Sequence, residues 1–169
     1  MLKLKDGGSL QRVVLCRDGE ELVVASNTGR LLRLAVNEAN LPVMGRNAQG
    51  PVLLRLLPGE TVVGAAGVDA EGSVLLASAR GQIKRLGVAG LRRCQRGDLG
   101  QIGLRFEQRE DQLIDLRPGS ADLVAGLLSD GRSLRLATAA LIAEDPGGSG
   151  MALALTASDR LNALVPLGL

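Results

Sequence analysis

A repeat of about fifty residues constrains this chain more than any other feature of its sequence. Each of three glycines spaced 50 residues apart is followed by a short apolar stretch: Gly50, Gly100 and Gly150. A second landmark, a glycine followed by three residues and then Arg-Leu, recurs at Gly29, Gly81 and Gly131. Because two separate landmarks keep nearly the same period, the chain is an internal repeat array.

Glycine and proline divide the chain so finely that short strands fit it better than helices. With 23 glycines and 6 prolines, no stretch free of both is longer than 15 residues, which leaves little room for helices of ordinary length. The first copy predicts four strands, at residues 22–26, 30–36, 52–57 and 61–66. Hairpin turns are expected at 27–29 and 129–131, where glycine supplies a positive φ. A helical repeat stays open as an alternative, because leucine and alanine are abundant.

Four strands in about fifty residues match one blade of a propeller-like fold. We therefore predict an all-β array of three four-stranded blades, at residues 21–70, 71–121 and 122–169, which form one structural domain. Residues 1–20, with a strand at 12–16, are expected to be the tail of a preceding blade in a longer protein. Closed propellers need about four blades or more, so the array should be open. Missing blades, another domain or a second copy would then cover its edges.

Composition narrows the function. The chain has no His, Tyr or Trp, which argues against catalysis by this chain alone and disfavours base stacking on single strands. A carboxylate pair at Glu110 and Asp111 is a weak alternative, because neighbours on a strand point to opposite faces. Cys16 and Cys94 have no metal-ligand spacing, and no nucleotide-binding loop is present, so no cofactor is expected.

The short, charged start is not a signal peptide, and no apolar run is long enough to span a membrane. We therefore expect a cytoplasmic protein with no membrane partner.

Positive charge gathers in the second copy. Residues 71–120 carry a net charge of +3, whereas residues 121–169 carry −2. Between residues 80 and 105, seven cations face one anion, Asp98. Such a cluster can neutralise phosphates of duplex DNA, and glycine-rich loops at 45–50 and 95–100 can present backbone amides to them. The loop Glu144-Asp145-Pro146 is acidic, so a phosphate path should leave the array before it.

The sequence resembles the C-terminal domain of the A subunit of bacterial DNA gyrase and of its relative topoisomerase IV. Three stretches of the first copy carry the resemblance most strongly, namely residues 23–33, 44–50 and 58–64. The resemblance implies a β-pinwheel, a propeller-like disc that usually has six blades, so this array is partial by comparison. It also implies a basic rim that binds and bends duplex DNA beside the cleavage domain.

The resemblance has a gap. The family's gyrase members carry a loop Gln-Arg-Arg-Gly-Gly-Lys-Gly that is tied to chiral wrapping, and this chain has no complete copy of it. In that register, residues 94–100 keep only Arg96, Gly97 and Gly100. Either the blade with that loop lies upstream of Met1, which is the interpretation we favour, or this protein binds DNA without such wrapping.

The expected function is binding and bending of duplex DNA without sequence specificity, as a module of a type II topoisomerase located in the cytoplasm at the nucleoid. The cleavage tyrosine and the ATPase would lie outside this chain, and the implied partners are duplex DNA, the cleavage region and the ATPase subunit. The expected DNA contacts are Lys84, Arg85, Arg92, Arg93 and Arg96, supported by Arg30, Arg33, Arg46, Arg55 and Arg105. The alternative is a protein-interaction module whose arginines serve solubility.

Overall fold

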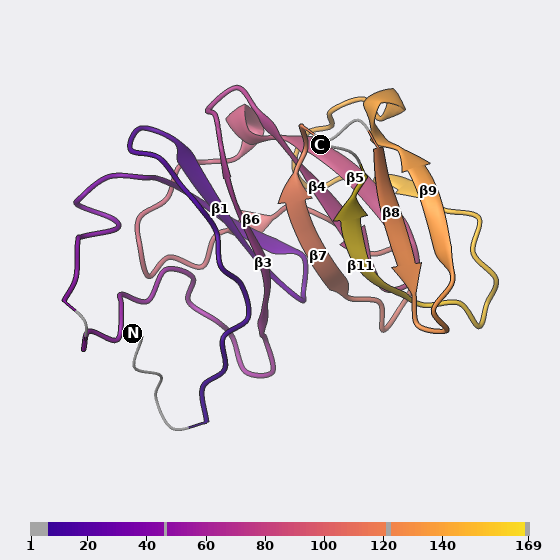
Figure 1. Cartoon of the computed structure of the whole chain (residues 1–169), viewed down its shortest axis with the longest axis horizontal. Coiled ribbons are helices and arrows are strands. Elements are labelled where there is room, and N and C mark those ends of the chain that lie inside the picture. Colours follow the sequence, from indigo (N-terminus) through magenta and orange to yellow (C-terminus); the bar gives the residue numbers. More distant parts are fainter. Residues whose placement is uncertain (1–6, 46, 121–122, 168–169) are drawn as a thin grey trace.

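The computed structural model describes residues 7–45, 47–120 and 123–167 as a row of three antiparallel β-sheets (Figure 1). The first sheet has the order β3-β1-β2-β6, built from Val62–Val68, Glu21–Ser26, Arg30–Ala35 and Gln101–Ile102. The second has the order β10-β5-β4-β7, built from Met151–Ala152, Gln82–Gly87, Ser73–Ser78 and Leu113–Pro118. The third has the order β11-β8-β9, built from Leu161–Pro166, Leu123–Leu128 and Ser133–Ala137. The all-β, unclosed pinwheel-like architecture expected from the sequence is confirmed.

Each sheet begins with a hairpin that the sequence dictates. In the first hairpin Gly29 has a φ of 81°, which allows the tight turn after β1. The pairing places Val24 opposite Leu32 and Val23 opposite Arg33. Because side chains alternate along a strand, Leu32 and Leu34 share one face of the sheet, and Leu31 and Arg33 share the other.

The outer strand of a sheet comes from the next copy of the repeat. Strand β6, which follows Gly100, pairs with β2 of the first sheet, and Arg30 lies opposite Ile102. Strand β10, which follows Gly150, pairs in the same way with β5 of the second sheet. A copy of the sequence repeat therefore contributes strands to two neighbouring sheets.

Two expected strands are absent, and the strand exchange explains the first of them. Residues 52–57 form no strand, and only Leu54 makes an isolated bridge, to Asp98. Their counterparts pair with an edge of the preceding sheet, and the described residues before β1 form no strand that could offer 52–57 such an edge. Residues 12–16 also form no strand, because no neighbouring strand shares hydrogen bonds with them in the described parts of the chain.

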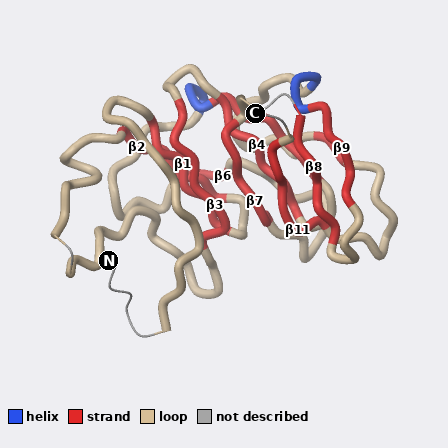
Figure 2. Tube along the Cα trace, in the orientation of Figure 1, coloured by secondary structure: helices blue, strands red, loops and turns tan. Residues whose placement is uncertain are grey.

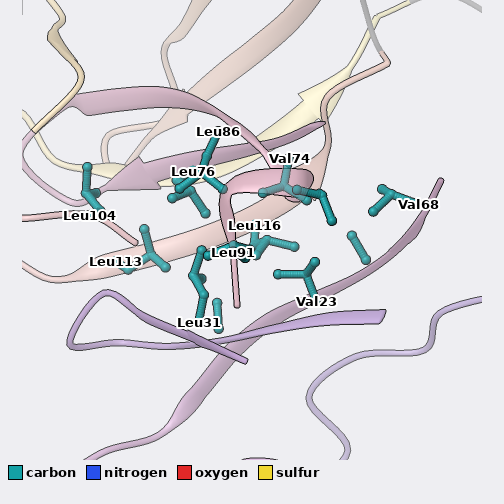
Figure 3. Close-up of a cluster of buried hydrophobic side chains, with 13 residues drawn as sticks. Val23, Leu31, Val68, Val74, Leu76, Leu86, Leu91, Leu104, Leu113 and Leu116 are labelled. Carbon is teal, nitrogen blue, oxygen red and sulfur yellow. The ribbon is translucent and has the colours of Figure 1, made fainter. Parts of the chain in front are cut away.

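Two apolar layers hold the sheets together. Between the first and second sheets, Val23 and Leu31 pack with Leu76, Leu86 and others, as Figure 3 shows. Between the second and third sheets, Leu75 and Ile83 pack against residues of the third sheet such as Val124. Burial of such side chains contributes about 1.5–3 kcal/mol each, so these layers are the main source of stability.

The described residues contain very little helix. Their helices are two turns of 3₁₀ helix, η1 (Val88–Gly90) and η2 (Thr138–Ala140), drawn in blue in Figure 2. None of the described helices is long and apolar enough to cross a membrane.

Candidate nucleic-acid interface

Three exposed arginines of the second copy lie on one loop, residues 91–99, which we call the basic loop. It connects η1 to β6 and carries Arg92, Arg93 and Arg96 in exposed positions. Arg55 lies beside it, because its amide donates to the Asp98 carbonyl at 2.9 Å and the Gly97 amide donates to the Leu53 carbonyl at 2.7 Å. The structure thus brings four arginines from two copies into one exposed region.

Arg33 supports the start of the basic loop from inside. Its side chain is buried, and its Nη1 donates to the carbonyls of Val88 and Leu91 at 2.8 and 3.0 Å. Its Nε donates to Glu21 at 3.1 Å. Arg33 therefore fixes η1 directly before the exposed arginines and is turned inward, which corrects the expectation that it supports the DNA contact directly.

Glu21 joins this support to the surface. Arg93 donates to the second carboxylate oxygen of Glu21, while the Arg93 side chain stays 58% exposed. Burial alone would raise the pKa of Glu21, but hydrogen bonds from Arg33 and Arg93 outweigh burial and lower it. Because Glu21 stays ionised, it orients Arg93 without covering it.

Arg30 is the second internal support. Its guanidinium donates to Glu60 and to the carbonyl of Leu99, and its Nη2 donates to the Arg55 carbonyl at 3.1 Å. Hydrogen bonds from Arg30, and in addition from the Thr28 hydroxyl and the Leu57 amide, outweigh burial and lower the pKa of Glu60 to about 2. Arg30 is buried and ties the end of the basic loop to Arg55, so it too acts as scaffold and not as a rim residue.

Lys84 also lies away from the rim on which the sequence placed it. It is 1% exposed, and its Nζ donates to the carbonyls of Asp145, Gly103 and Gly148 at 2.6, 3.1 and 3.1 Å. Burial lowers the pKa of the Lys84 ammonium, and the nearby carboxylates of Glu144 and Asp145 oppose that shift. Lys84 holds the acidic loop, residues 141–149, against the second sheet.

The remaining expected contacts are separated from the basic loop or lie outside the described residues. Arg85 is half-buried on the face of β5 opposite to Lys84, and its guanidinium donates to the Gly119 carbonyl. Arg105 is exposed, but its amide donates to the Gly148 carbonyl at 3.2 Å, so it borders the acidic loop. Arg46 lies outside the described residues.

Sequence reasoning missed the carboxylates that turn Arg30 and Arg33 inward. Glu60 lies 30 residues from Arg30, and Glu21 lies 12 residues from Arg33. The signal was present in part, because Glu21 starts a strand of buried apolar residues, where an unpaired charge would be costly.

Within the described residues, no group of three or more Cys, Asp or Glu side chains is placed to hold a metal ion. Nothing in those residues pairs with the guanidinium groups of Arg55, Arg92 and Arg96. These groups are free to meet an external anion, and their chemistry suits phosphate.

Known proteins are similar to this chain in sequence and in fold. The family model for the DNA gyrase C-terminal domain, beta-propeller, matches residues 20–69 and 72–120. The A subunit of DNA topoisomerase 4 from Synechocystis sp. is 31% identical over 125 residues, which cover 69% of this chain and 14% of that protein. The A subunit of DNA gyrase from Pseudomonas aeruginosa is 31% identical over 113 residues, which cover 67% of this chain and 12% of that protein. The chain thus spans a small part of these curated relatives.

Solved structures agree at the level of the fold. A DNA gyrase A C-terminal domain superposes with a TM-score of 0.83 at 18% identity, covering 96% of this chain and 56% of that one. The C-terminal domain of DNA topoisomerase IV superposes with a TM-score of 0.75 at 16% identity, covering 87% of this chain and 46% of that one.

Proposed function

This chain belongs to the DNA gyrase C-terminal domain family, and from that premise we propose that it binds and bends duplex DNA as a module of a type II topoisomerase. Cleavage and ATP hydrolysis then belong to other parts of the enzyme, which would be its partners together with DNA in the cytoplasm, at the nucleoid. The observation that carries the proposal is the set of exposed guanidinium groups on the basic loop and at Arg55.

The proposed contact is with the phosphate backbone. Arginine donates two parallel hydrogen bonds to phosphate, and neutralising phosphates releases counterions. The described residues contain no α-helix to enter the major groove, so the contact carries little base information. Bending would still favour deformable steps in the duplex.

The internal supports favour a preorganised surface. Arg33 fixes the backbone before Arg92, and Arg30 fixes the backbone at Leu99 and Arg55. A loop held at both ends loses less conformational entropy on binding than a mobile loop would. This rigidity supports a surface that imposes a path on DNA.

The test is a charge reversal of the basic loop. The variant Arg92→Glu/Arg93→Glu/Arg96→Glu is compared with Arg17→Glu/Arg109→Glu/Arg135→Glu, which changes the net charge equally at exposed arginines elsewhere. Fluorescence anisotropy with a labelled duplex should show a large loss of affinity for the first variant and a small one for the second. With four cations at phosphates, log K for the unaltered chain should fall with log salt at a slope of roughly −3.6.

Equal losses in both variants would mean diffuse attraction and not a site. Unchanged binding in the first variant would favour the alternative function, a protein-interaction module. Bending is tested separately by relaxing a plasmid with a type I topoisomerase in the presence of the chain, because constrained writhe then remains as altered linking number.

A further inference from the structure

The chain makes one kind of strand contact twice: a short strand (the donating side) pairs with the edge of the preceding sheet (the receiving side), as β6 does with β2 and β10 with β5. Within the described residues, the first copy has a donating side without a receiving sheet, and the third sheet has a receiving edge without a donated strand. Where the contact is made, a glycine with positive φ opens a short strand that pairs with the preceding sheet. Gly100 and Gly150 both have a φ of 71°. Gly50 has nearly the same backbone, with a φ of 75°, but the residues after it pair with no sheet in the described parts of the chain.

The donating side is tightly packed where the contact is made and empty where it is not. A Cβ atom on Gly100 would collide with the carbonyl oxygen of Leu31, and one on Gly150 would collide with that of Ile83. A Cβ atom on Gly50 would meet nothing within 4 Å. Gly50 therefore has the backbone φ of the glycines that open a paired strand, but it contacts no sheet in the described residues.

The receiving side shows the same difference. A Cβ atom on Gly29 would lie 2.5 Å from the Leu104 carbonyl oxygen, and one on Gly81 would lie 2.6 Å from a methyl group of Leu155. At Gly131, which has a φ of 88°, the space is open within 4 Å. Among residues 7–45, 47–120 and 123–167, sheet three accordingly ends at β9, whereas the first two sheets continue to β6 and β10.

An exposed arginine lies at the unpaired edge of the third sheet. Arg30 pairs with Glu60, and Arg132 at the equivalent position pairs with Asp159. The Arg30 side chain is 9% exposed because the next copy brings the Leu99 carbonyl to it, but the Arg132 side chain is 59% exposed. The carbonyl that would complete the site by the same spacing is that of Gln49.

Apolar surface surrounds the donating side. Val52 is 65% exposed, and it borders an open groove of about 780 Å³ that Leu22, Val24 and Val14 also line. On the third sheet, Leu127 and Val165 remain 37% and 38% exposed. Both ends of the row thus expose hydrophobic side chains to water. A contact between the ends would bury part of this apolar surface.

We propose that residues 50–53 of one copy of this chain add as a fourth strand to β9 of a second copy, head to tail. The two ends lie at opposite sides of the row in Figure 1, so a chain cannot close this contact on itself. The register follows from the two contacts already made, with Pro51 opposite Ser133 and Val52 opposite Arg132. This association is separate from DNA binding and does not depend on it.

Hydrogen bonding is compatible with this register. The Gly103 amide donates to the Gly29 carbonyl at 2.9 Å, and the Leu153 amide donates to that of Gly81 at 2.8 Å. The Leu53 amide would donate to the Gly131 carbonyl in the same way. Pro51 has no N–H to offer, but proline is tolerated at the first residue of a strand.

A disulfide trap tests the register. One preparation carries Pro51→Cys and another carries Ser133→Cys, and the two are mixed in a glutathione redox buffer. Facing residues of a hydrogen-bonded antiparallel pair have Cα atoms about 5.5 Å apart, which suits a disulfide. Peptide mapping should find residue 51 linked to residue 133 and separate this product from disulfides of Cys16 or Cys94. The control replaces Pro51→Cys by Asp69→Cys, an exposed site that lies outside the proposed contact.

Sedimentation of the unaltered chain across a dilution series tests the association without cross-linking. We expect species at multiples of the 17.5 kDa chain mass, and their loss in Ser133→Lys, because a lysine on an edge strand blocks pairing. Circular dichroism of Ser133→Lys should match that of the unaltered chain, since residue 133 is exposed. A monomer at every concentration, together with cross-linking no greater than in the Asp69→Cys control, would overturn the proposal.

Discussion

The basic loop and the acidic loop have similar backbone conformations but opposite charges. In one, the Cys94 amide donates to the Arg33 carbonyl at 2.7 Å, and in the other, the Glu144 amide donates to the Arg85 carbonyl at 2.9 Å. Gly97 and Gly147 both have a φ of 85°. Yet the first loop exposes three arginines, whereas the second exposes Glu144 and Asp145.

Hydrogen bonds to the backbone keep the shape of these loops the same while leaving their side chains free to vary. Arg30 supports the basic loop through the carbonyls of Leu99 and Arg55. Gln82, at the equivalent position, binds the carbonyls of Ser149 and Arg105 at 2.9 and 3.1 Å. A neutral amide and a charged guanidinium thus perform the same structural task, but only the guanidinium needs a buried carboxylate beside it.

The largest expected effect separates these two supports. Arg30→Ala leaves Glu60 buried without its partner and should cost about 3–5 kcal/mol of unfolding free energy. Gln82→Ala leaves two carbonyls without a donor and should cost about 1–3 kcal/mol. Urea unfolding followed by circular dichroism measures both, and equal costs would contradict the distinction between a charged and a neutral support.

The second prediction concerns pH. Because the pKa of Glu60 falls to about 2 in the folded chain from 4.5, its pairing with Arg30 stabilises the fold fully above pH 4.5. That stability is lost as the pH falls from 4.5 towards 2. In thermal unfolding, Glu60→Gln should flatten the dependence of Tm on pH in this window, and the exposed control Glu71→Gln should leave it steep.

The third prediction converts one loop into the other. Glu144→Arg/Asp145→Arg places two cations on a backbone like that of the basic loop and should raise DNA affinity on the order of tenfold at low salt. The control Glu144→Gln/Asp145→Asn removes the acidic charge without adding cations and should produce a smaller gain. Anisotropy titrations of both variants would show whether the acidic loop lies near the DNA path, and no gain in either would place it away from that path.

The smallest expected effect distinguishes the neighbours of the two loops. Arg55→Ala should weaken DNA binding by about threefold and reduce the salt slope by about 0.9, the value for one phosphate contact. Arg105→Ala, beside the acidic loop, should change neither quantity. If both substitutions weakened binding equally, the DNA-binding surface would extend past the basic loop.

Local pattern in the sequence predicted much of the fold but not the outer strands. Strands expected at 22–26, 30–36 and 61–66 occur at Glu21–Ser26, Arg30–Ala35 and Val62–Val68. Their alternation and the glycine turn between the first two are local signals. The strand expected at 52–57 failed, because pairing there depends on a sheet from a preceding copy, and no local pattern reports whether that sheet is present.

The candidate site was predicted in part for a related reason. The exposed positions of Arg92, Arg93 and Arg96 agree with the charge cluster in the sequence. Arg30, Arg33 and Lys84 were misplaced, since the groups that bury them are carboxylates and carbonyls brought in by folding. Charge density along a sequence counts cations, but the partners that neutralise or cover them lie on other strands.

The borrowing of β6 by the first sheet has a consequence for the order of synthesis. Arg30 pairs opposite Ile102, so the first sheet can be completed only after most of the second copy has been translated. Pairing across such a span is slow, because the conformational entropy of the intervening loop is lost before the strand contacts form. The nascent chain therefore carries an unfinished sheet edge through much of its time on the ribosome, and each new copy closes the edge that the copy before it left open.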